Sequence, residues 1–542
     1  MSRLFAIWSF YFALAGAPAF AVDSGADLEA TYADFLDAHG AVEAIEAGAL
    51  PTVEGRDVGY WKARRTETSN KIKLYFNSIK NKSNNLLPCD IQASLQRTFE
   101  ELSEDGTDST AVSARCGDAA DPSLQGARLS AALYACFDSP GNQIAFEGRR
   151  MTRVAALQSL QEIEEPARRE ALFLALEPLW RTVNAGSEAD SPYRRLIRAH
   201  AAAFARGQSP VHEAAASFGI SAEEAQRWLV RILAAWAAAN RDGAPAEPWD
   251  YRYRHSTASR ALSASIPRDA LLSLQQRFFA DLGADPRRLG ILFDIDPRPG
   301  KAPLAYSDTV RIGRMIEGHW RPALARVSAN DDRGGLGVLN ELVHETGHAV
   351  HFMAIRARPA LFWPDTTFIE ALADVPSWSV YAPRWQSKYL GRAVSRADGL
   401  REQYAGVVLD AAWGLFELRL LRDPTLDPNR LWTDITGRYL NIVPHPELSW
   451  WAVRSQLVSD PGYMVHYGLG AVITAEIRTR TAAAIGGFDA GNPRWYAWLS
   501  SQLLASGDAL PARERLRIFL GHQASPEALL ADIASISSPL RP

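Results

Sequence analysis

The chain has 542 residues, 47% of them hydrophobic and 22% charged, with a formal net charge of −4. This composition excludes a disordered chain, and the balanced charge, without a long run of one sign, argues against nucleic acid or an anionic membrane surface as partner. The length predicts a large core in two or more lobes, so we expect the substrate in a cleft. The sequence leaves the oligomeric state open.

The first 21 residues have the features of a secretory signal peptide. A nearly all-apolar run over residues 4–16 follows Arg3, and Ala19-Phe20-Ala21 forms a small-x-small cleavage site. The run is shorter than the ~20 residues that span a bilayer, so we expect a cleaved leader rather than an anchor. We therefore predict cleavage after Ala21, a periplasmic or secreted protein, and no membrane association after cleavage.

Helical periodicity dominates the next part of the chain. It covers residues 27–46 and 151–240, whereas strand alternation is scarce, so the fold class is expected to be mostly α. All three cysteines (Cys89, Cys116 and Cys136) lie in the N-terminal part. In an oxidising compartment we expect one disulfide and one free thiol, and the sequence leaves the pairing open.

Residues 338–355 form an apolar helix that carries an H-E-x-x-H motif, His344-Glu345-Thr346-Gly347-His348. Two histidines four residues apart lie on one helical face, so both can bind one ion, and Glu345 can act on a water beside it. The motif predicts one Zn²⁺ per chain, with His344 and His348 as ligands and Glu345 as general base. The alternative is a pair of core histidines that bind backbone carbonyls.

A third ligand is expected from the following helix, over residues 367–374. Catalytic zinc takes three protein ligands and keeps one open position, and Glu370 lies 22 residues after His348. Glu370 and Asp374 share a helical face, so one can bind zinc while the other accepts the second N–H of a ligand histidine. We assign Glu370 as the ligand and Asp374 as the supporting acid; two solvated acids are the alternative.

The segment from 445 to 467 holds further candidates. Tyr463 and His466 are predicted to donate hydrogen bonds to the oxyanion of the transition state, with Tyr467 as a further substrate-binding residue. His445, between two prolines, is a candidate for contact with the substrate, and Arg454 for binding a substrate carboxylate. The alternatives are a packed aromatic helix, a loop histidine and a solvated arginine.

Four segments of the chain resemble motifs of the thimet oligopeptidase family of zinc peptidases. Residues 248–253 are similar to its Trp-Asp-x-x-Tyr element, 298–303 to its Arg-x-Gly-Lys segment, and 344–351 to its H-E-x-G-H-x-x-H core. Residues 461–467 resemble the Gly-Tyr-containing helix that presents substrate-binding tyrosines. The resemblance covers residues 248–480 and implies a mostly helical, two-lobed zincin peptidase with a deep channel for short peptides.

The third-ligand segment departs from that family. Ahead of Pro376-Ser377, thimet oligopeptidases have a ligand glutamate where this chain has Asp374, whereas the angiotensin-converting-enzyme relatives have Glu-x-x-x-Asp, which Glu370 and Asp374 match. Export also fits those relatives better. We expect a gluzincin peptidase region over residues 146–540, preceded by an N-terminal helical region over 22–145.

The expected activity is zinc-dependent hydrolysis of peptide bonds in short peptides. The sequence leaves oligopeptidase, dipeptidyl carboxypeptidase and carboxypeptidase action open, because the mode depends on where the channel closes. One alternative is a different zinc amidohydrolase, such as a deacetylase. A second is a peptide-binding protein that keeps zinc without catalysis, against which the intact Glu345 argues.

Overall fold

The computed structural model describes residues 25–79 and 114–537, apart from Ser139, Asn142 and residues 241–242, 299–300 and 302–304. The predicted signal peptide, its cleavage site and Cys89 lie outside the described residues. Cys116 and Cys136 form a disulfide, which is one of the pairings that the sequence left open.

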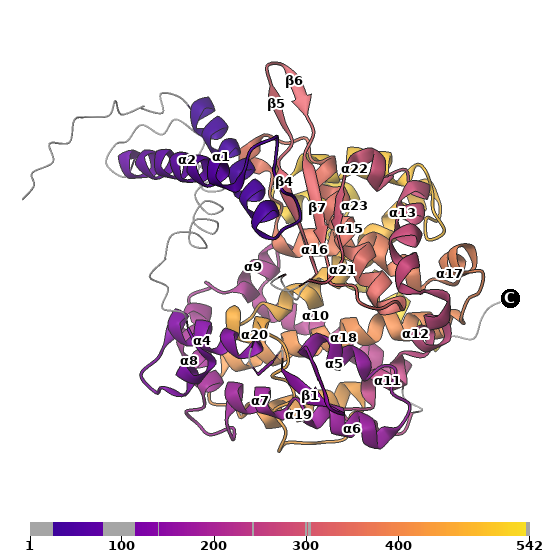
Figure 1. Ribbon diagram of the computed structural model, residues 1–542. Coiled ribbons are helices and arrows are strands. Elements are labelled where there is room, and N and C mark those ends of the chain that lie inside the picture. The colour runs from indigo at the N-terminus through magenta and orange to yellow at the C-terminus, as the bar shows by residue number, and fades with distance from the viewer. Residues whose placement is uncertain are drawn as a thin grey trace, which may run out of the picture.

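Helices make up most of the described chain, which confirms the predicted fold class (Figure 1). The N-terminal half contains α1 (Gly25–Glu46), α2 (Val58–Ile79), α4 (Gly126–Asp138), α5 (Arg153–Ser159), α6 (Pro166–Leu174), α7 (Glu177–Asn184), α8 (Pro192–Ala205), α9 (Pro210–Ala216), α10 (Ala222–Ala239), α11 (Tyr251–His255) and α12 (Thr257–Leu262). The C-terminal half contains α13 (Leu271–Asp281), α14 (Pro286–Leu289), α15 (Leu336–Ala354), α16 (Thr366–Ser377), α17 (Pro383–Leu390), α18 (Arg396–Arg422), α19 (Pro428–Leu440), α20 (Gln456–Ser459), α21 (Met464–Ile485), α22 (Trp495–Gln502), α23 (Ala512–Leu520) and α24 (Glu527–Ala534).

The strands are short and form three small sheets. Two are antiparallel pairs, β1 (Ile144–Phe146) with β2 (Arg149–Met151) and β5 (Arg314–Ile316) with β6 (His319–Arg321). The third has the order β3-β7-β4, in which β7 (Leu324–Ser328) pairs parallel with β3 (Leu292–Asp294) and antiparallel with β4 (Tyr306–Arg311). Both β4 and β7 pack against α15, so this sheet supports the helix that carries the H-E-x-x-H motif.

Three central helices, α15, α16 and α21, lie between two groups of elements (Figure 1). In the view of Figure 1 the sheet, α13, α22 and α23 lie above them, and α5, α6, α7 and α19 lie below. The central helices pack in series, α15 on α16, α16 on α21 and α21 on α18. This arrangement gives the molecule two lobes that meet at the central helices.

The N-terminal helices pack against each other and against the sheet. Helix α1 contacts both α2 and β4, and Val310 of β4 joins a small buried cluster with Val42 of α1 and Trp61 of α2. Gly40 permits this approach, because a Cβ atom there would lie 2.0 Å from the Thr309 carbonyl oxygen. The boundary near residue 145, between the N-terminal helical region and the peptidase region, stays a prediction.

None of the helices within the described ranges is long and apolar enough to cross a membrane.

Candidate metal centre

The two helices that carry the motif residues lie in close contact because of one glycine. A Cβ atom on Gly347 would lie 2.8 Å from the carbonyl oxygen of Ala373, so only glycine lets α15 and α16 approach this closely. Asp365 caps α16 by accepting a hydrogen bond from the Phe368 backbone N–H at 3.1 Å. Glu370 and Asp374, one turn apart on α16, are thereby held against the histidines of α15.

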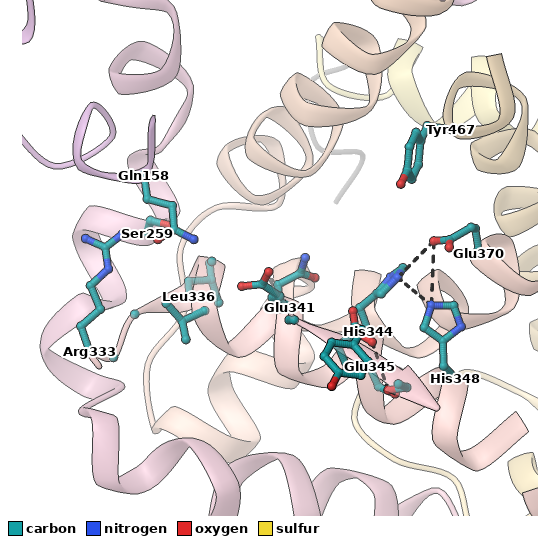
Figure 2. Close-up of a pocket in the computed structure, with 18 of the residues that line it drawn as sticks. Gln158, Ser259, Arg333, Leu336, Glu341, His344, Glu345, His348, Glu370 and Tyr467 are labelled. Atoms are coloured by element: carbon teal, nitrogen blue, oxygen red, sulfur yellow. Dashed lines mark hydrogen bonds and ion pairs between the residues drawn. The ribbon is translucent and has the colours of Figure 1, made fainter. Parts of the chain in front are cut away.

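His344, His348 and Glu370 present three ligand atoms to one point (Figure 2). The Nε2 atoms of the two histidines are 3.1 Å apart, and Glu370 Oε2 lies 3.4 Å from His344 Nε2 and 3.8 Å from His348 Nε2. Tetrahedral ligands at zinc bond lengths of about 2.0–2.1 Å are about 3.3 Å apart. The triangle therefore has the dimensions of a zinc site, with Glu370 at its third corner.

Asp374 occupies the supporting position. Its Oδ1 lies 2.7 Å from His344 Nδ1 and accepts a hydrogen bond from Ser377 Oγ at 3.1 Å. A carboxylate at Nδ1 holds the proton of the ring there and leaves the Nε2 lone pair free for a metal. Within the described residues His348 Nδ1 has no such acceptor.

The electrostatics of the triangle favour a positive charge. Burial disfavours the charged form of His344, but the carboxylates of Asp374 and Glu370 raise its pKa well above the usual range. Burial alone would raise the pKa of Glu370, yet the neighbouring histidines lower it to about 2. Burial lowers the pKa of His348 to about 4, which keeps its imidazole neutral and able to bind a metal.

Glu345 lies beside the triangle and is 8% exposed. The Ser307 hydroxyl of β4 lies 3.0 Å from Glu345 Oε2 and 2.7 Å from the Glu345 backbone oxygen, both of which can accept its hydrogen bond. Burial raises the pKa of Glu345 to about 7, which is suited to a group that takes up and releases a proton near neutral pH. Sequence reasoning missed Ser307, because nothing local links a strand serine to a helix 38 residues away.

Tyr467 lines the same cavity as the triangle, and Figure 2 shows its hydroxyl directed into the cavity on the side of Glu370. The Tyr463 ring centroid lies 5.6 Å from that of Tyr467 and 5.0 Å from that of His466. His466 is 3% exposed, and its Nδ1 lies 2.6 Å from the Thr367 hydroxyl. The predicted donors Tyr463 and His466 do not line this cavity, whereas Tyr467, predicted as a further substrate-binding residue, does.

His445 and Arg454 are engaged with acidic residues. His445 Nε2 lies 2.8 Å from Glu247 and its Nδ1 lies 2.6 Å from Glu447. Arg454 forms an ion pair with Asp410 and lies over the Trp413 ring at 4.8 Å from its centroid. Neither residue lines the cavity that holds the triangle.

The cavity over the triangle has a volume of about 780 Å³. Polar groups line the end of the cavity remote from Tyr467, where Figure 2 shows Gln158, Arg333 and Ser259. A space of this size accommodates several residues of an extended peptide.

No family model matches the chain, and no curated protein does. Solved structures do resemble it, and they include two whose descriptions name peptidases. PZ peptidase A with an inhibitor shares 15% identity over 93% of this chain and 85% of that chain, with a TM-score of 0.54. A protein assigned as oligoendopeptidase F shares 15% identity over 95% of this chain and 96% of that chain, with a TM-score of 0.57. The chain therefore has the same overall fold as these proteins.

Proposed function

We propose that the protein is a zinc-dependent peptidase that hydrolyses short peptides. The observation that carries the proposal is the triangle of two imidazole nitrogens and one carboxylate oxygen, with the Glu345 carboxylate beside it. Its two nitrogens and one oxygen are the donor set that zinc takes in metallopeptidases. The fold of two named peptidases supports the choice of peptides as substrates.

Each group in the cavity has a role in this reaction. Zinc bound by His344, His348 and Glu370 would supply a Lewis acid for the scissile carbonyl and for a water molecule. Glu345 accepts a proton from that water and delivers it to the leaving amine, so the C–N bond breaks and one water is consumed. Ser307 holds the Glu345 carboxylate in position between these two transfers.

The carbonyl oxygen gains negative charge as water adds and therefore needs a hydrogen-bond donor. We assign this donor to the Tyr467 hydroxyl, which lines the cavity near Glu370. Burial raises the pKa of Tyr467 far above neutral, so the phenol keeps its proton for donation. The Tyr463 ring packs against the Tyr467 ring and also contacts His466.

A digest of a mixed peptide library tests the proposal. Purified protein loaded with zinc is incubated with the library, with and without a chelator, and the products are identified by mass spectrometry. We expect new peptide termini that disappear with the chelator and return when zinc is restored. Release of acetyl groups without cleavage would indicate a different amidohydrolase, and bound but intact peptides would indicate a binding protein. Either result contradicts the proposal.

A further inference from the structure

A second, smaller cavity of about 250 Å³ adjoins the one that holds the triangle. The two cavities share three lining residues, Gln161, Gly337 and Asn340, so they lie side by side. Asn340 lies on α15 one turn before His344, and four residues of helix rise about 6 Å. This distance corresponds to roughly two residues of an extended peptide.

Arg252 of α11 lines the smaller cavity. Within the described part of the chain, no hydrogen bond or ion pair reaches its guanidinium, whereas the buried arginines Arg169, Arg326 and Arg515 all have partners. Arg252 is half-buried as a whole residue, and it is one of the residues that line this cavity. A guanidinium presents five N–H donors in a fork that matches a carboxylate.

Two further arginines, Arg153 and Arg454, lie near Arg252. Burial and the charge of Arg454 lower the pKa of both Arg153 and Arg252 to about 10. Asp410 is the carboxylate that opposes them, and it is already paired with Arg454. Arg153 donates to the Val453 carbonyl oxygen at 2.6 Å. Arg252 is thus the unpaired cation of this group.

The other acids of the smaller cavity are also engaged. Asp374 accepts from Ser377 and contacts His344, and Glu402 accepts hydrogen bonds from the backbone N–H and hydroxyl of Ser259. Both carboxylates are therefore already bound to groups other than Arg252. A negative charge supplied by a ligand would complete the site.

We propose that Arg252 binds the C-terminal carboxylate of the peptide substrate and directs cleavage close to the C-terminus. This inference rests on the proposed peptidase function and adds the substrate class, peptides with a free C-terminal carboxylate. It also distinguishes Arg252 from Arg454, the arginine that the sequence suggested for this role, because Arg454 already has Asp410 as its partner. The distance along α15 places the cleaved bond within the last few residues of the substrate.

Three peptides of otherwise identical sequence test the inference. The first ends in a free acid, the second in an amide, and the third in an amide with aspartate as its last residue. We expect the wild-type protein to cleave the free acid with a kcat/KM roughly 10- to 100-fold above that of the amide, mostly through KM, because one charge-assisted pair is lost. Mass spectrometry should show short C-terminal products. If the aspartyl amide is cleaved with the same kcat/KM as the free acid, the site also binds side-chain carboxylates, and the proposal fails.

Substitutions at Arg252 identify the residue responsible. Arg252→Met should remove the preference for the free acid, and Arg252→Lys should retain part of it as a point charge without the fork. Arg254→Met is the matched control: Arg254 is on the same helix but is exposed, and its guanidinium bonds the backbone oxygens of Ala244 and Pro245. It should keep the preference. A preference that persists undiminished in folded Arg252→Met would overturn the assignment.

The same comparison separates this inference from the proposed function. Equal cleavage of acid and amide by the wild type would overturn the carboxylate site and leave the peptidase proposal standing. Cleavage of none of the peptides would count against the peptidase proposal. In that case the binding of fluorescent acid and amide peptides to Glu345→Gln protein still decides the inference, because equal affinities would refute it.

Discussion

Glu370 and Asp374 have different roles because they contact different nitrogens of His344. Glu370 Oε2 lies 3.4 Å from Nε2, whereas Asp374 Oδ1 lies 2.7 Å from Nδ1, on the other side of the ring. One imidazole can bind a metal through one nitrogen and be oriented through the other. The geometry thus favours the Glu-x-x-x-Asp assignment over a ligand at Asp374.

This assignment predicts different outcomes for the two substitutions. Glu370→Ala should nearly abolish zinc retention, because it removes a ligand. Asp374→Asn should weaken zinc affinity by roughly 10- to 100-fold and leave the site assembled, because it changes only the orientation of His344. Zinc content after identical dialysis against a mild chelator is the measurement. A zinc-loaded Glu370→Ala beside an empty Asp374→Asn would reverse the assignment.

A buried acid a few residues before α15 should make stability depend on pH. Asp331 is 6% exposed, its Oδ2 has no hydrogen-bond partner among the described residues, and burial raises its pKa to about 6. The folded state therefore holds a proton that the unfolded chain releases near pH 4, so this stabilisation is present below about pH 4 and is lost as pH rises through about 6. Asp331→Asn should raise the free energy of unfolding by roughly 1 to 3 kcal/mol at pH 8 and by less at pH 5.

Denaturant unfolding at the two pH values measures this difference. Asp332→Asn, at the neighbouring exposed position, is the control and should change stability little at either pH. An equal effect of Asp331→Asn at pH 5 and pH 8 would contradict the ionisation argument.

The residues on one helix could be predicted, whereas their distant partners could not. The spacing of His344, Glu345 and His348 places them on one face of any helix, so no tertiary information is needed. Ser307 and Arg252 reach the site from β4 and α11, and nothing in their local sequence pattern indicates contact with the cavity. Nor could the sequence show that Arg454 has Asp410 as its partner.

At the scale of elements, the helices that carry the site closely match their predicted ranges. Helix α15 covers Leu336–Ala354 and α16 covers Thr366–Ser377, against predictions of 338–355 and 367–374. Helix α16 continues through Pro376, whose missing N–H lies in its last turn. The strands have three to six residues and irregular burial, so periodicity gives no signal for them.

The contact between α15 and α16 yields a prediction for Gly347→Ala. The new Cβ would lie 2.8 Å from the oxygen and 2.9 Å from the Cα of Ala373, so the helices must separate. We expect overpacking to cost roughly 1–3 kcal/mol of stability and zinc retention to fall as Glu370 withdraws. Gly337→Ala, on the same helix with nothing within 4 Å of its Cβ, is the matched control. Equal zinc retention and unfolding free energy in the two variants would contradict this account of the contact.

At the scale of the whole molecule, local periodicity predicted the helical class, but the assembly of the lobes depends on distant contacts. Helix α1 is an example, because its packing on β4 joins segments about 270 residues apart in the chain and relies on a close approach at Gly40. The sequence also left the disulfide pairing open. Cys116 and Cys136 are brought together by the loop that precedes α4.

We further propose that the protein is exported, with cleavage after Ala21. The Ala19-Phe20-Ala21 site motivates this prediction, and the Cys116–Cys136 disulfide supports it because disulfides persist in oxidising compartments. Sequencing the N-terminus of the mature protein from its native host should give Val22 as the first residue. A mature chain that still begins at Met1 would refute export by this route.

The most direct test of the central claim is Glu345→Gln, measured for both zinc and turnover. Glu345 lies beside the triangle and is not one of its three corners, so the variant should bind about one zinc per chain, as the wild type does. It should lose peptide hydrolysis by at least roughly 100-fold, because an amide cannot accept the proton of the attacking water. Turnover near the wild-type level in a zinc-loaded Glu345→Gln protein would contradict the account.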